Sequence, residues 1–265
     1  DTRTDIAFIH DFAHPFPMVV IANLLGVPAT DIAQFKVWSD AIVEPFSMMA
    51  SRERRIECAR LVVEMQHYFA EMIAERRKHP RDDFISEALA YRDTSGESFD
   101  MQELMTLITI DLLASGNETT TAAIGSGIKL LLEDPAAMEA LAQNPALVPV
   151  AIEEMLRLES PVQGMFRECA HAANIGEVGF AKGDLLNIRF GSANRDEARY
   201  DHAERLDFQR KKPGSHLAFG IGRHVCVGAA LARQEMISAF SQLFGRYQSF
   251  ALTADTPLPT YQPSF

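Results

Sequence analysis

The chain has 265 residues, of which 47% are hydrophobic, and its formal net charge is -11. A globular chain of this size buries about 70–75% of its surface, and the negative charge argues against general binding to nucleic acid or anionic lipid. The three cysteines are far apart and match neither a zinc site nor a disulfide framework. No apolar run approaches the roughly 18 residues of a membrane span. We therefore expect a cytoplasmic protein that binds neither nucleic acid nor a membrane.

The first half of the chain is predicted to be helical, because its apolar residues recur at spacings of three and four. The charged sequence AERRKHPRDD, residues 74–83, is expected to be a solvated helix end. Asp100 is expected to cap a long central helix that is apolar nearly all round. The expected helices are Pro17–Leu25, Thr30–Pro45, Arg52–Arg77 and Met101–Leu132.

The second half adds two helices, Pro135–Gln143 and Ala146–Leu158, and then changes character. Between Val162 and Phe190, short alternating runs separated by glycines predict small antiparallel strands. A polar stretch leads to a last helix over residues 229–244. The fold class is therefore mainly α with small antiparallel β-sheets (α+β), and we expect one domain over residues 1–265.

The segment HLAFGIGRHVCVGAALAR, residues 216–233, holds a lone cysteine, Cys226, between a glycine-rich turn and the expected helix start. Free backbone N–H groups and the dipole at a helix start favour a thiolate. From the residues alone, three uses remain open: a packing cysteine, a nucleophile paired with His224 or His216, or one ligand to a metal held mainly by other groups. A structural zinc ion needs four ligands, whereas haem iron needs only an axial one.

The pattern from Phe219 to Gly228, with Gly220, His224 and Cys226 between them, resembles the haem-binding signature of the cytochrome P-450 superfamily. The following AALAR is similar to the bacterial soluble branch. The resemblance implies that Cys226 is the proximal ligand of haem b (iron protoporphyrin IX), that Phe219 packs nearby, and that His224 reaches a haem propionate. The other two cysteines, Cys58 and Cys169, carry no motif and are expected to pack.

The central helix contains DLLASGNETTT, in which a glycine and back-bonding threonines predict a bend. Ordinary back-bonding in a packed helix is the alternative. The run resembles the family's central-helix motif, with Gly116, Glu118 and Thr119 matching. The resemblance implies that Thr119 holds the oxygen-bound species or its water, and that Glu118 relays protons to it. Ser115, where alanine or glycine is more common, adds a hydroxyl near the ligand.

Glu154 and Arg157 lie on one helical face and can pair. Such pairs at a surface contribute little, but these residues match the family's Glu-x-x-Arg motif. The resemblance implies that Arg205 joins them and that Arg167 contacts a propionate. The residues expected to line the substrate cavity are Asp111, Ala114, Val162, Gln163 and Met165.

The resemblance covers the chain almost end to end and implies a cytochrome P-450 fold that is incomplete at the N-terminus. It implies a haem-thiolate monooxygenase that takes dioxygen and hydroxylates a small apolar organic substrate. Electrons would come from a ferredoxin-type donor with its NAD(P)H-dependent reductase, docking on a basic patch that consists of Lys211, Lys212, Arg223 and Arg233. The rival functions are a haem-binding sensor or peroxide-driven peroxygenase on the same scaffold, and a Cys226/His224 cysteine hydrolase.

Overall fold

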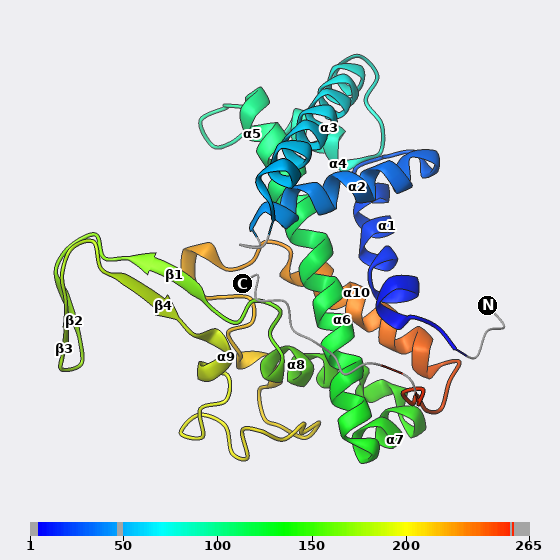
Figure 1. The fold of residues 1–265 in the computed structure, drawn as a ribbon, viewed down its shortest axis with the longest axis vertical. Coiled ribbons are helices and arrows are strands. Elements are labelled where there is room, and N and C mark those ends of the chain that lie inside the picture. The colour runs from blue at the N-terminus through cyan, green and yellow to red at the C-terminus, as the bar shows by residue number, and fades with distance from the viewer. Residues whose placement is uncertain (1–4, 47–49, 255, 257–265) are drawn as a thin grey trace. The chain divides into compact units, whose positions relative to one another are not determined.

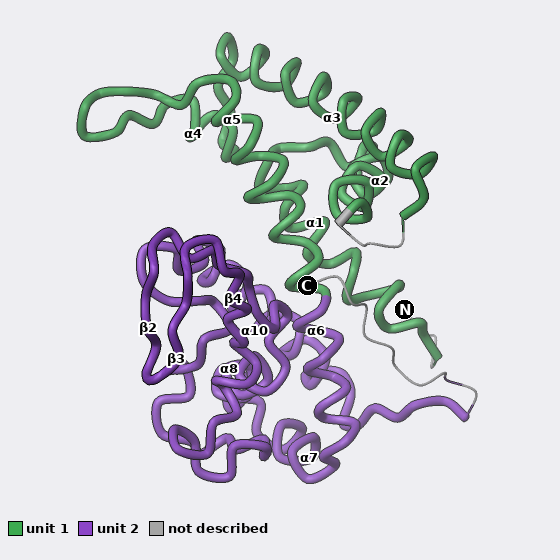
Figure 2. Tube along the Cα trace, turned by 60° about the vertical axis from the view of Figure 1, so that its left-hand side comes forward, with its two compact units in different colours: residues 1–121, 264 green, residues 122–263, 265 purple. Residues whose placement is uncertain are grey.

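The computed structural model describes residues 5–46, 50–254 and 256. It is mainly helical with two small antiparallel sheets, as predicted (Figure 1). Its contacts form two compact units, one ending at Thr121 and the other beginning at Ala122 (Figure 2). The boundary lies within one helix, α6 (Ser115–Glu133). Among the residues described, no helix combines the length and apolar character needed to cross a bilayer.

The first unit is built from helices. Its α-helices before α6 are α1 (Pro15–Leu24), α2 (Ile32–Val43), α3 (Arg52–Lys78), α4 (Phe84–Ala90) and α5 (Met101–Thr106). Shorter helical segments are η1 (Ile9–Ala13), η2 (Ala29–Asp31) and η3 (Glu44–Phe46). Helix α2 packs on α3, where the rings of Phe35 and Phe69 meet at 6.1 Å between centroids. The predicted helices of this half are confirmed, whereas α4 was not predicted.

The charged run at residues 74–83 ends α3 and is mostly exposed, as predicted, but two of its charged side chains are buried. The Arg76 side chain is 4% exposed and the Asp83 side chain 3% exposed, and they form an ion pair 2.5 Å long. Arg76 also donates to the carbonyl of Gly26, and the Asp83 carboxylate accepts the N–H of Ser86 to cap α4. Burial of a charge requires such partners, so this charged sequence joins the end of α3 to α4.

The central helix is continuous but not uniform. Asp100 caps α5 through a capping box with Glu103, and a π-helical segment, η4 (Leu107–Ala114), then leads into α6. Gly116 follows this segment, and a Cβ atom there would lie 3.0 Å from Cδ1 of Ile21 on α1. The π-helical stretch ends before Gly116 and the threonines, where the bend was predicted, so that bend stays a prediction. Gly116 lets two helices approach closely.

The second unit contains the remaining helices and all the described strands. Its helices are α7 (Pro135–Gln143), η5 (Pro145–Leu147), α8 (Val148–Leu158), α9 (Phe190–Ala193), η6 (Pro213–Ser215), η7 (Gly222–His224) and α10 (Ala229–Phe244). Its core lies where α8 packs on α10. A Cβ atom at Gly127 of α6 would lie 2.7 Å from Phe240 and 2.9 Å from Met155, so this glycine makes room for both side chains.

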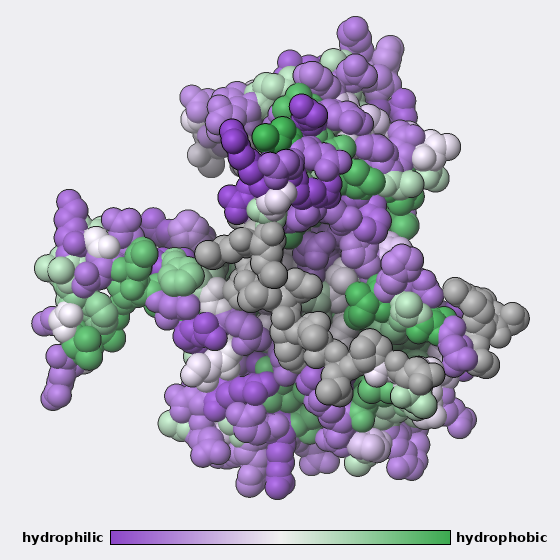
Figure 3. All heavy atoms as spheres, viewed as in Figure 1, coloured by the Kyte–Doolittle hydropathy of each residue, from purple (hydrophilic) through white to green (hydrophobic). Residues whose placement is uncertain are grey.

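The strands form two antiparallel pairs, β1 (Met165–Glu168) with β4 (Leu185–Ile188), and β2 (Ala173–Ile175) with β3 (Val178–Phe180). Met165 lies opposite Ile188 in the first pair. Apolar side chains are exposed on these strands, including Phe166 at 67% and Leu185 at 72%. Figure 3 shows apolar surface over this part of the unit.

Candidate functional site

Cys226 lies on a tight turn in the second unit. Its backbone N–H donates to the carbonyl oxygen of Phe219 at 2.9 Å. Gly220 and Gly222 have φ values of +69° and +80°, a region that favours glycine. Helix α10 begins at Ala229, as predicted, after the cap residue Gly228, so Cys226 lies on the turn just before the helix.

The burial of the cysteines separates their roles. Cys58 is buried at 0% exposure, as expected for a packing residue. Cys226 is exposed, and so are Ile221 at 78%, Val225 at 54% and Val227 at 89% on the same loop. Burial is the usual state of a free packing cysteine, so packing does not explain this residue. An exposed thiol among exposed apolar side chains fits a large apolar group with a metal at its centre, such as haem.

The two histidines of the segment do not form a catalytic pair with the thiol. The Nε2 atom of His216 lies 3.0 Å from Glu153, and its Nδ1 accepts the N–H of Ala218 at 3.2 Å. His224 is exposed on η7. Within the described ranges, no hydrogen bond joins Cys226 to either histidine. The activated nucleophile that a cysteine hydrolase needs is therefore not assembled.

Arg167 and His224 are the residues expected to reach haem propionates. Arg167 is exposed on β1, and among the described residues its guanidinium donates only to the carbonyl of Phe166, at 2.8 Å. An arginine with further donors directed to solvent can bind a carboxylate in bidentate fashion. Both side chains are therefore accessible to an anionic group, although the role of each stays a prediction.

Glu154 and Arg157 form a buried pair, in contrast to a typical surface pair. Both side chains are 0% exposed, and the guanidinium donates to both carboxylate oxygens, at 2.8 and 2.9 Å. Arg157 also donates to the backbone carbonyls of Asn194, Ala203 and Arg205, at 3.0, 2.6 and 2.9 Å. The pair thus ties α8 to the irregular segment that precedes the Cys226 turn.

The third member of this network is Arg210, and the prediction of Arg205 was wrong. The Nε atom of Arg210 donates to Glu154 at 2.9 Å, and its side chain is 7% exposed. Arg205 is exposed and offers Arg157 its backbone carbonyl instead. The N–H of Asp207 also donates to Glu154, at 3.1 Å. The chain therefore turns around the Glu154 carboxylate, and this turn points the side chain of Arg210 toward it.

The first unit holds the predicted acid and alcohol of the central helix. Thr119 Oγ1 donates to the carbonyl of Ser115 at 2.6 Å, and the hydroxyl of Ser115 donates to the carbonyl of Ile110 at 2.9 Å. Both hydroxyls are therefore bonded back to the helix backbone, and such a bond at Thr119 is part of both interpretations of this run. Because the Thr119 proton is already donated, its oxygen is left as an acceptor. The adjacent Glu118 is half-buried, and burial raises the pKa of its carboxyl group.

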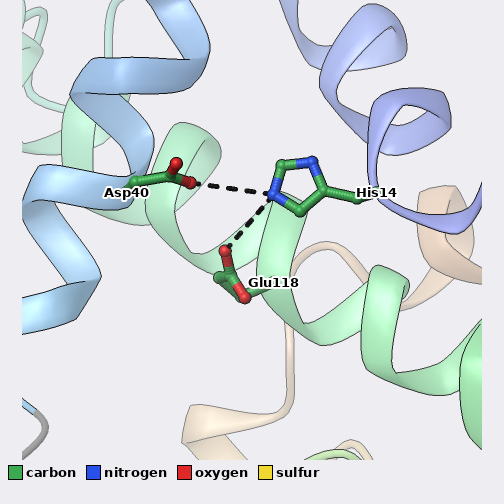
Figure 4. Close-up of side chains that lie close together, drawn as sticks. All are labelled: His14, Asp40 and Glu118. Carbon is green, nitrogen blue, oxygen red and sulfur yellow. Dashed lines mark ion pairs between the residues drawn. The ribbon is translucent and has the colours of Figure 1, made fainter. Parts of the chain in front are cut away.

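Two residues that the sequence did not indicate lie beside Glu118. The Nε2 atom of His14 is 3.9 Å from Glu118 Oε1 and 3.7 Å from Asp40 Oδ1 (Figure 4). Lys36 pairs with the other oxygen of Asp40 at 2.7 Å. The imidazole of His14 opposes the effect of burial on the pKa of Glu118, whereas Asp40 adds to it. The three groups form a half-buried titratable cluster from separate helical segments, which no local spacing reveals.

The residues expected to line a substrate cavity are divided between the units. In the first unit, Ala114 is half-buried, and Asp111 lines an open hollow in which Asp100, Gln102 and Glu103 are further members. Phe99, Thr106 and Leu107 complete its lining, which is therefore mixed in character, whereas small-molecule pockets are lined mainly by apolar side chains.

In the second unit, Met165 is 47% exposed and Val162 is half-buried. The side chain of Gln163 donates to the carbonyl of Ser160 at 2.7 Å, and the backbone carbonyl of Gln163 accepts the N–H of Gly191 at 3.1 Å. Gln163 therefore has a local structural contact that accounts for its amide, while the cavity assignments stay predictions.

Comparison with known proteins gives one consistent answer. The family model described as cytochrome P450 matches residues 30–264. Cytochrome P450 107B1 of Saccharopolyspora erythraea is 38% identical over 253 residues, covering 95% of this chain and 60% of that protein. A steroid C26-monooxygenase of Mycobacterium tuberculosis is 34% identical over 262 residues, covering 99% of this chain and 70% of that protein.

Solved structures agree with these relatives. The crystal structure of CYP109E1 from Bacillus megaterium with corticosterone has a TM-score of 0.92 and 35% identity, covering 100% of this chain and 70% of that one. P450BioI in complex with a fatty-acyl-ligated acyl carrier protein has a TM-score of 0.85 and 35% identity, covering 94% of this chain and 63% of that one. The chain spans 60–65% of the length of the first curated relatives that it matches. From these matches and the residues described above, the chain belongs to the cytochrome P450 family.

Proposed function

We propose that this chain carries the haem-thiolate centre of a monooxygenase that inserts one atom of dioxygen into an apolar organic substrate. Proteins of the family bind iron protoporphyrin IX through a cysteine thiolate. The observation that carries the proposal is the exposed Cys226 on its glycine-dependent turn. When bound, the haem would supply oxygen activation, which thiolate donation favours.

The side chains around Cys226 have roles in haem binding that their surroundings support. Cys226 would bind the haem iron through its thiolate, while the carbonyl oxygen of Phe219 accepts the backbone N–H of the cysteine. Arg167 and His224 would bind the two propionates, because both are exposed cations or hydrogen-bond donors near no competing carboxylate in the described contacts. The network of Glu154, Arg157 and Arg210 would keep the segment before the turn in place.

Glu118 and Thr119 would deliver protons to the reaction site. Thr119 donates its own proton to Ser115, so its oxygen can accept a hydrogen bond from a water molecule and hold that water in place. Burial raises the pKa of Glu118, which brings the carboxyl group nearer to the pH at which it can both hold and release a proton. His14, whose Nε2 atom lies 3.9 Å from Glu118, would exchange protons with it once the two groups approach to hydrogen-bond distance.

The substrate class and the electron donor are inferred from relatives and from charge. Relatives include proteins named for steroid oxidation, for polyketide biosynthesis and for biotin biosynthesis, which supports a largely apolar organic substrate. A ferredoxin-type donor would use the exposed cations Lys211, Lys212 and Arg223. Arg233 is a weaker member of that patch than predicted, because it is paired with Glu153 at 2.6 Å.

The test is the absorption spectrum of the reduced, carbon-monoxide-treated full-length protein. Wild type should give the red-shifted Soret band of thiolate ligation, and Cys226→Ser should lose it. Cys169→Ser is the matched control, since this half-buried cysteine should leave the band unchanged. A band that survives in Cys226→Ser, or that never forms in wild type, refutes the proposal. Product formed with hydrogen peroxide but not with dioxygen and reduced ferredoxin would favour the peroxygenase alternative.

A further inference from the structure

Glu153 on α8 connects three parts of the second unit. Its carboxylate accepts two hydrogen bonds from Arg233 on α10, at 2.6 and 3.1 Å. The Nε2 atom of His216 lies 3.0 Å from the same carboxylate. The His216 side chain is 0% exposed and that of Glu153 15% exposed, so these bonds are largely shielded from water. Shielding strengthens hydrogen bonds between charged groups.

Both partners of Glu153 also contact the segment that leads into the Cys226 turn. The Arg233 guanidinium lies 4.4 Å from the centroid of the Phe219 ring, within the range of a cation–π interaction. His216 accepts the N–H of Ala218 through Nδ1. Phe219 in turn accepts the N–H of Cys226 at 2.9 Å. A continuous series of contacts therefore runs from one carboxylate to the backbone of the cysteine.

The tautomer of His216 follows from these contacts. Because Nδ1 accepts a backbone N–H, the proton of the neutral ring is on Nε2, which donates to Glu153. Burial alone would raise the pKa of Glu153, but the bonds from His216 and Arg233 outweigh it and lower the pKa to about 2. The carboxylate is therefore charged throughout the neutral range and holds both partners there.

We propose that Glu153 is a positioning residue for Cys226, acting through Arg233 and His216 to fix the turn that presents the thiolate to iron. This role rests on the proposed function of Cys226. The neighbouring Glu154 serves a different purpose, since it binds Arg157 and Arg210 and holds the segment before the turn. Of these two adjacent glutamates on α8, Glu153 thus positions the turn itself and Glu154 holds the segment that precedes it.

The experiment uses the full-length, haem-loaded protein and two mild variants. Glu153→Gln keeps the size of the side chain but removes its charge, and Arg233→Lys keeps the positive charge but removes the planar group above Phe219. Glu159→Gln is the matched control, because this acid at the end of α8 pairs with Arg195 at 3.2 Å, which contacts no residue of the turn in the described bonds. The measurement is the rate at which the reduced, carbon-monoxide form loses its red-shifted Soret band at a fixed temperature, with helix content followed by circular dichroism.

We expect the band to decay about tenfold faster in Glu153→Gln and in Arg233→Lys than in wild type, since one charged hydrogen bond is sufficient for that factor. Helix content should persist while the band is lost, and Glu159→Gln should decay at the wild-type rate. Equal rates in all four proteins would overturn the role of Glu153. So would a band and a helix signal that decay together, because that result means global unfolding. A wild-type protein that never shows the band would instead refute the ligation of iron by Cys226.

Discussion

Arg157 makes five hydrogen bonds, and replacing it with lysine should lower the free energy of unfolding strongly. The five N–H donors of its guanidinium reach two oxygens of Glu154 and three backbone carbonyls. Lysine has three donors, so at least two acceptors lose their partner. Each buried polar group left unpaired costs about 1–3 kcal/mol.

The resulting loss is about 2–6 kcal/mol, and the structure favours the lower half of that range. Glu154 would keep its bonds from Arg210 and from the N–H of Asp207. Even so, the loss would be a large fraction of a total stability of about 5–15 kcal/mol.

The assay is urea unfolding of the full-length protein at fixed haem occupancy, because bound ligand itself adds stability. Arg195→Lys is the matched control, since its guanidinium is 32% exposed and pairs with Glu159 and Glu204 where water can replace it. That control should lose about 1 kcal/mol or less. If Arg157→Lys unfolds at the same urea concentration as Arg195→Lys, the reasoning from buried acceptors is refuted.

Three further predictions concern packing and pH. Gly127→Ala should destabilise by about 1 kcal/mol despite its better helix propensity, because the new Cβ meets Phe240. Adding Phe240→Leu should make the double variant more stable in urea than the sum of the single changes, and strict additivity would contradict the contact. Burial raises the pKa of Glu118, so its charged carboxylate destabilises the folded state. This cost is absent below the unfolded pKa of about 4.5 and grows as pH rises through the folded-state pKa. Glu118→Gln should therefore gain stability at pH 7 relative to wild type but not at pH 4, and an equal gain at both would contradict this. For Glu153 the pH dependence is reversed. Its pKa of about 2 means that its contribution to stability is present above pH 4.5 and lost as pH falls toward 2. The free energy of unfolding of Glu153→Gln should therefore depend less on pH between 4.5 and 2 than that of wild type.

The helices could be predicted because their signals are local. Helix α7 begins at a proline and follows the cap Asp134, and α3 follows the cap Ser51. The turn at Cys226 was equally local, since its glycines are close in sequence. Such features depend on neighbouring residues, which the order of the amino acids displays directly.

The parts that sequence reasoning missed depend on residues that lie far apart in the chain. Arg210 reaches Glu154 across 56 positions, and no spacing rule separates it from Arg205. His14 and Glu118 meet only because α1 packs beside the central helix. The buried pair of Arg76 and Asp83 was hidden because a charged sequence normally indicates exposure. The prediction of a single domain stays a prediction, as α6 belongs to both compact units.

The π-helical segment η4 changes which residues of the central helix can share a face. An α-helix turns by about 100° per residue, and a wider π turn takes up one residue more than an α turn. Side chains before Leu107 and after Ala114 are therefore offset from the pattern that a uniform helical wheel would draw. A deletion of one residue inside this segment would rotate Glu118 and Thr119 together around the helix axis. The two side chains would keep their spacing but point in another direction.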